Sequence, residues 1–306
     1  MRSNFMAFLT IFTAPKPFTN PHIATIQRNA IQSWLHLDAD VDVILIGEEE
    51  GLAATAAEFK LQHLANVARN QQGTPLVSSI FDLARQASQS PLLAYLNADI
   101  LVLPDFATIA HQVAAQANHF LVVGRRWDLQ VDHELDFGPG WEQRLRRDLQ
   151  DGGRLHAPAG SDFFIFPRHL FTEMPPFAIG RAGWDNWMIY HACQQSWPVI
   201  DATPSLKIIH QDHDYSHLPG GKPHYDLEES ERNMAMAGGQ MHMYNVLDTN
   251  RQLRGGRIRA PRPSLLRFLR AAEMKLAPPD GSRRGPRWTL ARRFRRWRRA
   301  LTGSRT

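Results

Sequence analysis

Short apolar runs alternate with segments of helical periodicity up to about Gly124. A continuous apolar run bounded by turn residues is typical of a buried strand, and apolar positions three and four residues apart are typical of an amphipathic helix. The pattern predicts strands at Phe5–Thr13, Val41–Gly47, Leu92–Leu96 and Phe120–Gly124, and helices between them at Pro21–Leu37, Val77–Ala87 and Phe106–Ala117. This alternation predicts an α/β/α sandwich with a mostly parallel central sheet.

The rhythm gives way after Gly124 to a loop-rich segment in which glycine and tryptophan are mixed with charged residues. Segments of this composition often line a binding site. Regular structure is expected again in a strand at Asp162–Phe166 and a helix at Trp184–Gln195. An extended stretch at Val199–Ile209, interrupted by Pro204, follows.

Two amphipathic segments lie near the end of the chain, on either side of a linker rich in proline and glycine, Pro278–Pro286. The second segment is rich in arginine and carries Trp288 and Trp297, residues that favour a headgroup interface. We therefore expect a helix that lies on an anionic membrane surface through residues 287–301. A basic tail without a fixed partner is the alternative.

The basic charge of the chain is concentrated in this last part. Residues 1–250 contain 17 Lys and Arg against 28 Asp and Glu, whereas residues 251–306 contain 18 against 2. We therefore divide the chain into an acidic body, 1–250, and a basic amphipathic tail, 251–306. The acidic body contains no motif that reads RNA or DNA, which makes nucleic acid an unfavoured partner.

Composition narrows the class of protein further. Hydrophobic residues make up 43% and charged residues 21%, values typical of soluble globular proteins. No apolar run approaches the roughly 18 residues of a membrane span. The single cysteine, Cys193, excludes an internal disulfide and a zinc site built from cysteines. We expect a cytoplasmic protein, which the tail can place on the inner face of the membrane.

A polar pair, Asn97 and Asp99, directly follows the predicted strand Leu92–Leu96. Ligands of open α/β sheets bind at the carboxyl ends of the strands. Two side chains separated by one residue point to the same side of an extended chain, so both can face one divalent cation and its phosphate oxygens. A strand-ending turn uses the same residue types and is the alternative.

Two later segments carry further candidates. Gly183-Trp184-Asp185-Asn186-Trp187 opens a predicted helix, and the helix dipole favours a carboxylate such as that of Asp185 in the first turn. His210–His217 holds three histidines and two aspartates after the extended stretch, and histidine is a common ligand for divalent transition metals. A solvated polar loop is the alternative, and the lack of an H-E-x-x-H helix disfavours a zinc hydrolase.

The order of elements, together with Asn97-Ala98-Asp99 and the acidic motif at Asp185, resembles the GT-A class of nucleotide-sugar glycosyltransferases of the bacterial family-2 type. The resemblance implies a Rossmann-like fold and transfer of a sugar from a nucleotide sugar, with a UDP-sugar as the expected donor. It implies inversion at the anomeric carbon, whereas the expectation of a glycan or lipid-linked acceptor comes from the basic tail. In this class a D-x-D motif holds Mn²⁺ or Mg²⁺ against the donor diphosphate, and this chain has Asn97 in place of the first aspartate.

The resemblance also implies roles for individual residues. Asp185 is the catalytic base, and the metal is held by Asp99, Asn97 and His210, the last of which is expected directly after the strand that ends at Ile209. The residues implied in binding the donor are Thr13, Lys16, Glu48, Asn97 and Asp162.

Two other functions remain compatible with the sequence. A nucleotidyltransferase has a similar sheet and metal motif, but it more often carries a glycine-rich phosphate loop after the first strand, and Thr13–Phe18 contains no glycine. A non-catalytic adaptor that binds membrane surfaces through its tail is the alternative from a different class.

Overall fold

The computed structural model describes residues 6–212, 228–278 and 282–302. His213, Asp214 and His217 of the histidine-rich segment therefore lie outside the described residues, as does Phe5 of the first predicted strand. The helix at Val77–Ala87 and the strand at Leu92–Leu96 have the predicted bounds. The first strand begins at Leu9, later than predicted, and the helix predicted to reach Ala117 ends at Ala114. The short helix Leu52–Glu58 and the strand Gln62–Leu64 were not predicted.

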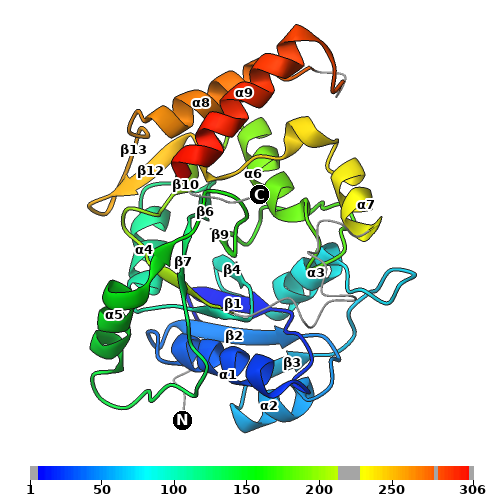
Figure 1. The fold of residues 1–306 in the computed structure, drawn as a ribbon. Helices are drawn as coiled ribbons and strands as arrows, with labels where there is room; N and C mark the ends of the chain where they lie inside the picture. Colours follow the sequence, from blue (N-terminus) through cyan, green and yellow to red (C-terminus); the bar gives the residue numbers. More distant parts are fainter. Residues whose placement is uncertain (1–5, 213–227, 279–281, 303–306) are drawn as a thin grey trace.

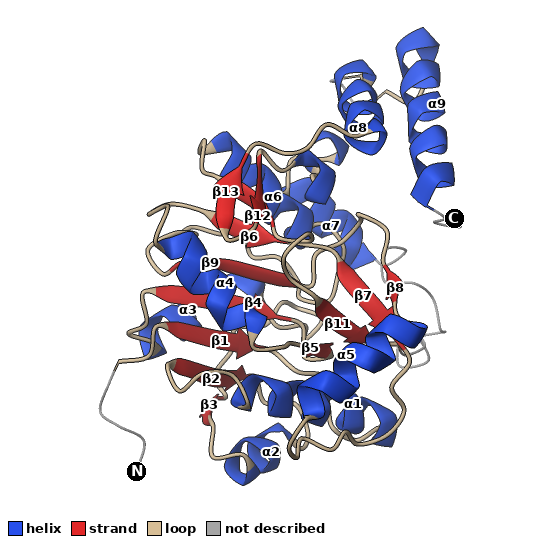
Figure 2. Cartoon of the chain, turned by 90° about the vertical axis from the view of Figure 1, so that its left-hand side faces the viewer, coloured by secondary structure: helices blue, strands red, loops and turns tan. Residues whose placement is uncertain are grey.

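A mostly parallel sheet forms the centre of the molecule (Figures 1 and 2). Across the described residues its nine strands follow the order β13-β12-β10-β6-β9-β4-β1-β2-β3, and β9 and β13 run antiparallel to their neighbours. Their bounds are β1 Leu9–Thr13, β2 Val41–Ile46, β3 Gln62–Leu64, β4 Leu92–Leu96, β6 Leu121–Val123, β9 Phe163–Pro167, β10 Val199–Asp201, β12 Arg251–Arg254 and β13 Arg257–Arg259.

Helices cover both faces of this sheet, as expected for an α/β/α sandwich. One apolar core joins the sheet to α1 (Pro21–Leu35), α2 (Leu52–Glu58) and α4 (Asp105–Ala114). A second core on the other face joins it to α3 (Val77–Ala87) and α6 (Trp184–Gln194). The predicted fold class is confirmed.

A smaller sheet stands beside the main one in the order β5-β11-β7-β8. It consists of β5 (Ile100–Leu101), β7 (Arg126–Leu129), β8 (Arg154–Leu155) and β11 (Ile208–Gln211), and a third apolar core packs it against α5 (Trp141–Gly152).

The smaller sheet corrects two expectations. The segment after Gly124 is more regular than its glycine content indicates, since it contains β7, α5 and β8. The extended stretch at Val199–Ile209 is two strands in different sheets, because the turn around Pro204 redirects the chain from β10 to β11. His210 consequently lies within β11, paired with Ile100, and not after the end of a strand.

The main sheet continues across the predicted division at residue 250. β12 pairs in parallel with β10, and a turn at Gly255 and Gly256, both with positive φ, returns the chain into β13. The first part of the predicted tail is thus a portion of the sheet. The role of 251–306 as a separate unit stays a prediction.

The two amphipathic helices predicted near the end of the chain are present as α8 (Leu265–Leu276) and α9 (Gly285–Thr302), which lie side by side as a hairpin (Figures 1 and 2). Leu269 of α8 and Ala291 of α9 are buried, whereas Leu265 and Trp297 are exposed. None of the helices in the described ranges is long and apolar enough to cross a bilayer.

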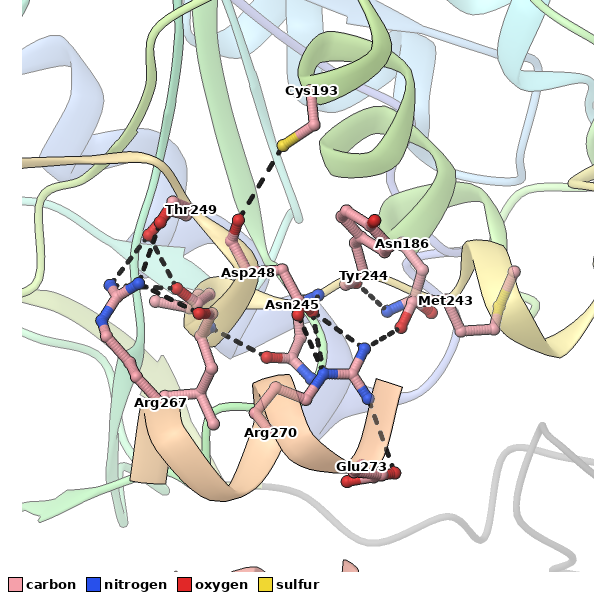
Figure 3. Close-up of polar contacts among 12 residues, drawn as sticks. Asn186, Cys193, Met243, Tyr244, Asn245, Asp248, Thr249, Arg267, Arg270 and Glu273 are labelled. Atoms are coloured by element: carbon pink, nitrogen blue, oxygen red, sulfur yellow. Dashed lines mark hydrogen bonds and ion pairs between the residues drawn. The ribbon is translucent and has the colours of Figure 1, made fainter. Parts of the chain in front are cut away.

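Two arginines clamp α8 to the body (Figure 3). Arg267 donates hydrogen bonds to the main-chain oxygens of Val246, Leu247 and Thr249, around the short helix η4 (Val246–Asp248). Arg270, only 5% exposed, pairs with Asp248 at 2.8 Å. These polar contacts fix the position of α8, because a shift of the helix would leave buried donors and acceptors without hydrogen bonds.

A single buried carboxylate joins the two helices of the hairpin. Glu273 of α8 is 1% exposed and accepts from Arg295 at 2.7 Å and from Arg298 at 2.8 Å, both on α9. Burial acts to raise the pKa of Glu273, but the charges of Arg298 and Arg270 hold it below its usual range. The carboxylate is therefore ionised at neutral pH and balances guanidinium charge between the helices.

We predict that Glu273→Gln weakens the docking of α9 on α8 by about 3 kcal/mol, because removing one partner of a buried ion pair leaves the other charged and unsatisfied. Urea unfolding at neutral pH measures the change. Glu228→Gln, which removes an exposed i,i+4 pair with Arg232, is the control and should cost less than about 1 kcal/mol. Equal unfolding curves for the two variants would contradict the role of Glu273.

Candidate functional site

The hydroxyl of Tyr95, the residue before the end of β4, marks the centre of the site. It is buried and donates a hydrogen bond to Oδ1 of Asn97 at 3.0 Å. Burial raises the pKa of Tyr95, and the negative charges of Asp99, Asp162 and Asp185 raise it further. Three acids predicted from separate parts of the sequence thus act electrostatically on one side chain at the carboxyl end of a central strand.

Asn97 is held by Asp162. The amide of Asn97 donates to Oδ1 of Asp162 at 3.0 Å, and its main-chain N–H donates to the Asp162 carbonyl at 2.9 Å. The antiparallel pairing of β4 with β9 places the two residues opposite each other. Arg126 of β7 donates to the same carboxylate oxygen at 2.8 Å. Nothing in this geometry tests Asn97 as a metal ligand, which stays a prediction.

Asp99 and His210 come together because β5 pairs with β11. Nε2 of His210 lies 3.8 Å from Oδ2 of Asp99. The buried side chain of Gln211 strengthens the junction, since its amide donates to the main-chain oxygens of Ile26 at 2.7 Å and Asp99 at 3.2 Å. Asn29 of α1 donates to Gln211 Oε1 at 3.0 Å. Two of the three predicted metal ligands are therefore neighbours.

Two further carboxylates, absent from the sequence-based set, lie beside the other ring nitrogen of His210. Nδ1 is 3.6 Å from Oδ1 of Asp128 and 3.4 Å from Oδ1 of Asp212. One ligand atom from each of these three residues falls within 4.8 Å of the other two. Asp128 was missed because β7 was not recognised as a strand. Asp212 could have been found, since it stands in the histidine-rich segment itself.

Asp128 remains ionised over the whole physiological pH range. Burial acts to raise its pKa, but a hydrogen bond from His156 at 2.7 Å and the charge of Arg126 lower it to about 2. An imidazole combined with carboxylate oxygens is a donor set that suits Mn²⁺, and the carboxylates alone suit Mg²⁺. The residues around His210 therefore fit a divalent cation.

Asp185 is the second residue of α6. The helix follows Gly183, whose φ of +111° is one that residues with a side chain rarely adopt. Its Oδ2 accepts a hydrogen bond from the main-chain N–H of Ser161 at 3.2 Å. Burial raises the pKa of Asp185 to about 6, although the main-chain N–H groups of Asn186 and Ser161 act to lower it. The carboxylate can therefore exchange a proton near neutral pH.

The loop after β1 brings a lysine toward the same centre. The side chain of Gln27 bonds both the main-chain N–H and the main-chain oxygen of Lys16, at 2.7 and 3.0 Å, which fixes the loop against α1. Burial lowers the pKa of Lys16, and the nearby Asp99 acts to raise it. Thr13, at the end of β1, is fully buried.

Glu48, the remaining predicted donor-binding residue, follows β2 and has a largely exposed side chain that Arg69 binds at 3.0 Å. The same arginine binds Glu49 at 2.9 Å, and that carboxylate is only 13% exposed. Trp184 packs in the second core against Tyr95 and Phe81, so its ring fills the core.

No family model and no curated protein sequence matches this chain. Among solved structures, glucosyl-3-phosphoglycerate synthase from Mycobacterium tuberculosis aligns over 84% of this chain and 88% of its own, with 14% identity and a TM-score of 0.49. The same enzyme in complex with Mn²⁺, UDP and phosphoglyceric acid gives a TM-score of 0.48 at 14% identity, over 76% and 80% of the two chains.

A mannosyltransferase from Pyrobaculum calidifontis in complex with GDP-Man and Mn²⁺ aligns over 99% of this chain and 77% of its own, with 12% identity and a TM-score of 0.47. At these identities and scores the likeness is one of chain path alone.

The raised pKa of Asp185 makes a prediction about stability. The folded state binds this proton more tightly than the unfolded chain, whose aspartate has a pKa of about 3.9, so folding stability is lost as the pH rises through about 6. Asp185→Asn cannot ionise, so its melting temperature relative to the wild type should rise between about pH 4 and pH 6 and stay level at higher pH. Asp148→Asn on the exposed face of α5 is the control. A difference that does not change with pH would contradict the raised pKa.

Proposed function

We propose that this chain is a metal-dependent glycosyltransferase of the GT-A type, which moves a sugar from a nucleotide sugar to an acceptor hydroxyl. The observation that carries the proposal is the group of polar contacts at the carboxyl end of β4, where Asp162 binds the amide of Asn97 at 3.0 Å and the N–H of Ser161 binds Asp185 at 3.2 Å. Ligands of open α/β sheets bind at this end of the strands. His210 beside Asp99 adds the nitrogen donor of a metal site.

Asp99 and Nε2 of His210 would hold the Mn²⁺ or Mg²⁺. Asp128 and Asp212 lie beside the other ring nitrogen, Nδ1. A bound divalent ion neutralises the negative charge that grows on a departing diphosphate. Lys16, near Asp99, offers a further positive charge to the same phosphate oxygens. Asn97 is the third ligand of the proposal, or it acts by orienting Asp162.

Asp185 is the proposed general base. With a pKa of about 6 it is mainly ionised at neutral pH and accepts the proton of the acceptor hydroxyl as that oxygen bonds to the anomeric carbon. The diphosphate leaves with the electron pair of the broken bond. Attack on the face opposite the diphosphate inverts the anomeric configuration.

The donor is proposed to be a UDP-sugar, with its nucleotide near Thr13, Lys16 and Glu48 and its sugar hydroxyls near Asp162. The acceptor is proposed to be a glycan or a lipid-linked molecule reached from the cytoplasmic side. Exposed Leu290, Trp297 and Leu301 on the arginine-rich α9 support contact of this helix with an anionic membrane surface.

The first test is thermal stability with UDP, GDP, CMP or dTDP, each with and without Mn²⁺. A ligand at about 100 times its dissociation constant stabilises a protein by roughly 2.7 kcal/mol, which raises the melting temperature by several degrees. We expect an Mn²⁺-dependent shift with one nucleotide, present in the control Asp148→Ala and lost in Asp99→Ala. The absence of any shift in the wild type would overturn the proposal and favour the adaptor.

The second test separates chemistry from binding. Asp185→Asn should keep the nucleotide-dependent thermal shift while its turnover of the nucleotide sugar that the first test identifies falls about a thousandfold, a typical effect of losing a general base. Wild-type kcat should rise with pH through about 6, because only the ionised carboxylate accepts the proton. Wild-type turnover in Asp185→Asn would remove Asp185 from the mechanism.

A further inference from the structure

A cavity of about 650 Å³ lies away from the candidate active site, between the helical hairpin and the body. Met234 of α7 (Glu228–Met236) and residues of the segment 238–242, which includes the short helix η3 (Gln240–His242), form one wall. Residues of α8 and α9 form the other wall, together with the described residues Ala277, Pro278, Ser282 and Arg283 of the connection. A volume of this size accommodates an organic molecule and greatly exceeds that of a phosphate ion.

The cavity carries a surplus of positive charge. Its described lining residues include four arginines, Arg270, Arg283, Arg292 and Arg295. None of the described lining residues is acidic. Arg270 and Arg295 are balanced by the buried carboxylates of Asp248 and Glu273.

The other two arginines supply the surplus. Within the described ranges, neither Arg283 nor Arg292 forms an ion pair with a carboxylate. Both are exposed, so their charges are available to a ligand that enters from solvent. Guanidinium groups bind phosphate oxygens through paired, charge-assisted hydrogen bonds, which makes a phosphate group the fitting partner.

Apolar side chains complete the lining. Met241 comes from the η3 side, and Met274, Ala277, Pro278 and Trp288 come from the hairpin. Methionine side chains adapt to irregular apolar ligands, and the tryptophan ring offers a broad face to an alkyl chain. Arg295 stacks over the Trp288 ring at 5.7 Å, so the charged and apolar parts of the lining are contiguous.

We propose that this cavity binds a phosphorylated amphiphile, with its phosphate or diphosphate head at Arg283 and Arg292 and the adjoining part of its apolar chain against Trp288 and the methionines. The cavity and its charges stand without the transfer reaction. Binding at this site is therefore independent of the proposed catalytic role of Asp185.

The position of α7 gives such binding a structural consequence. Met234 lines the cavity, while the preceding Asn233 bonds both the main-chain N–H and the main-chain oxygen of Ala178 at 2.9 Å. Ser230 of the same helix accepts from the N–H of Ala182 at 3.2 Å. One helix thus borders the cavity and braces the segment that leads to Asp185.

Calorimetric titration of the full-length protein at physiological ionic strength tests the proposal with three probes. They are dihexanoyl phosphatidic acid as a soluble monomer, inorganic pyrophosphate, and phosphatidylcholine vesicles that contain phosphatidic acid. Two double variants remove equal charge: Arg283→Ala with Arg292→Ala inside the cavity, and Arg296→Ala with Arg299→Ala on exposed positions of α9 outside it.

We expect the soluble amphiphile to bind the wild type and to bind the cavity variant at least about tenfold more weakly, since each substitution removes charge-assisted hydrogen bonds to the phosphate. The variant with Arg296→Ala and Arg299→Ala should change this affinity by less than about threefold, because these two arginines do not line the cavity and act on its ligand only across solvent, where salt screens their charges. Equal losses in both variants, or binding to vesicles alone, would overturn the proposal in favour of attraction by the basic surface.

The apolar part of the site has its own test. Trp288→Ala should weaken binding of the amphiphile and leave binding of pyrophosphate unchanged. Pyrophosphate that binds the wild type as tightly as the amphiphile would show a site for free phosphate and overturn the apolar part. Unchanged circular dichroism spectra of all variants verify that the hairpin is still folded.

Discussion

The antiparallel pairing of β5 with β11 is the contact on which the candidate site depends. It joins Ile100 and His210, which are far apart in the sequence, and the entropy lost in closing that loop must be offset where the two strands meet. The buried amide of Gln211 does this by bonding Ile26, Asn29 and the carbonyl of Asp99 simultaneously. A buried amide with all its partners specifies one arrangement of the chain, since any shift leaves it unsatisfied.

Different surroundings within the candidate site give its aspartates different pKa values. Asp128 accepts from His156 and Arg126, so its pKa falls to about 2 and it stays an anion beside His210. At Asp185 the removal of water outweighs the main-chain N–H groups of Asn186 and Ser161, so its pKa rises to about 6. Carboxylates whose pKa values are pushed apart in this way can take separate roles, one fixed in charge and one able to move a proton.

Elements that depend on local interactions could be predicted from the sequence, whereas an element that depends on long-range pairing could not. Strands such as Leu92–Leu96 are predicted by local apolar runs. The polar residues that follow them lie at the carboxyl end of the parallel sheet, where ligands of such sheets bind. β7 gave no such signal, since it is a segment of four residues, three of them half-buried and two of them charged, and its strand conformation comes from pairing with β11 and β8. Asp128 could not be placed for that reason. The helix α5 was detectable, because Trp141, Leu145 and Leu149 recur every four residues.

The pairing of β12 with β10 changes how the basic tail can be studied. A chain that ends at residue 250 loses Leu253 from the main apolar core and Arg267 from its contact with Asp201. It also leaves the main-chain groups of β10 open on one side, and an unprotected edge strand invites pairing with other molecules and aggregation. Truncation at that point would confuse misfolding with lost binding, whereas neutralising arginines on α9 leaves the sheet intact.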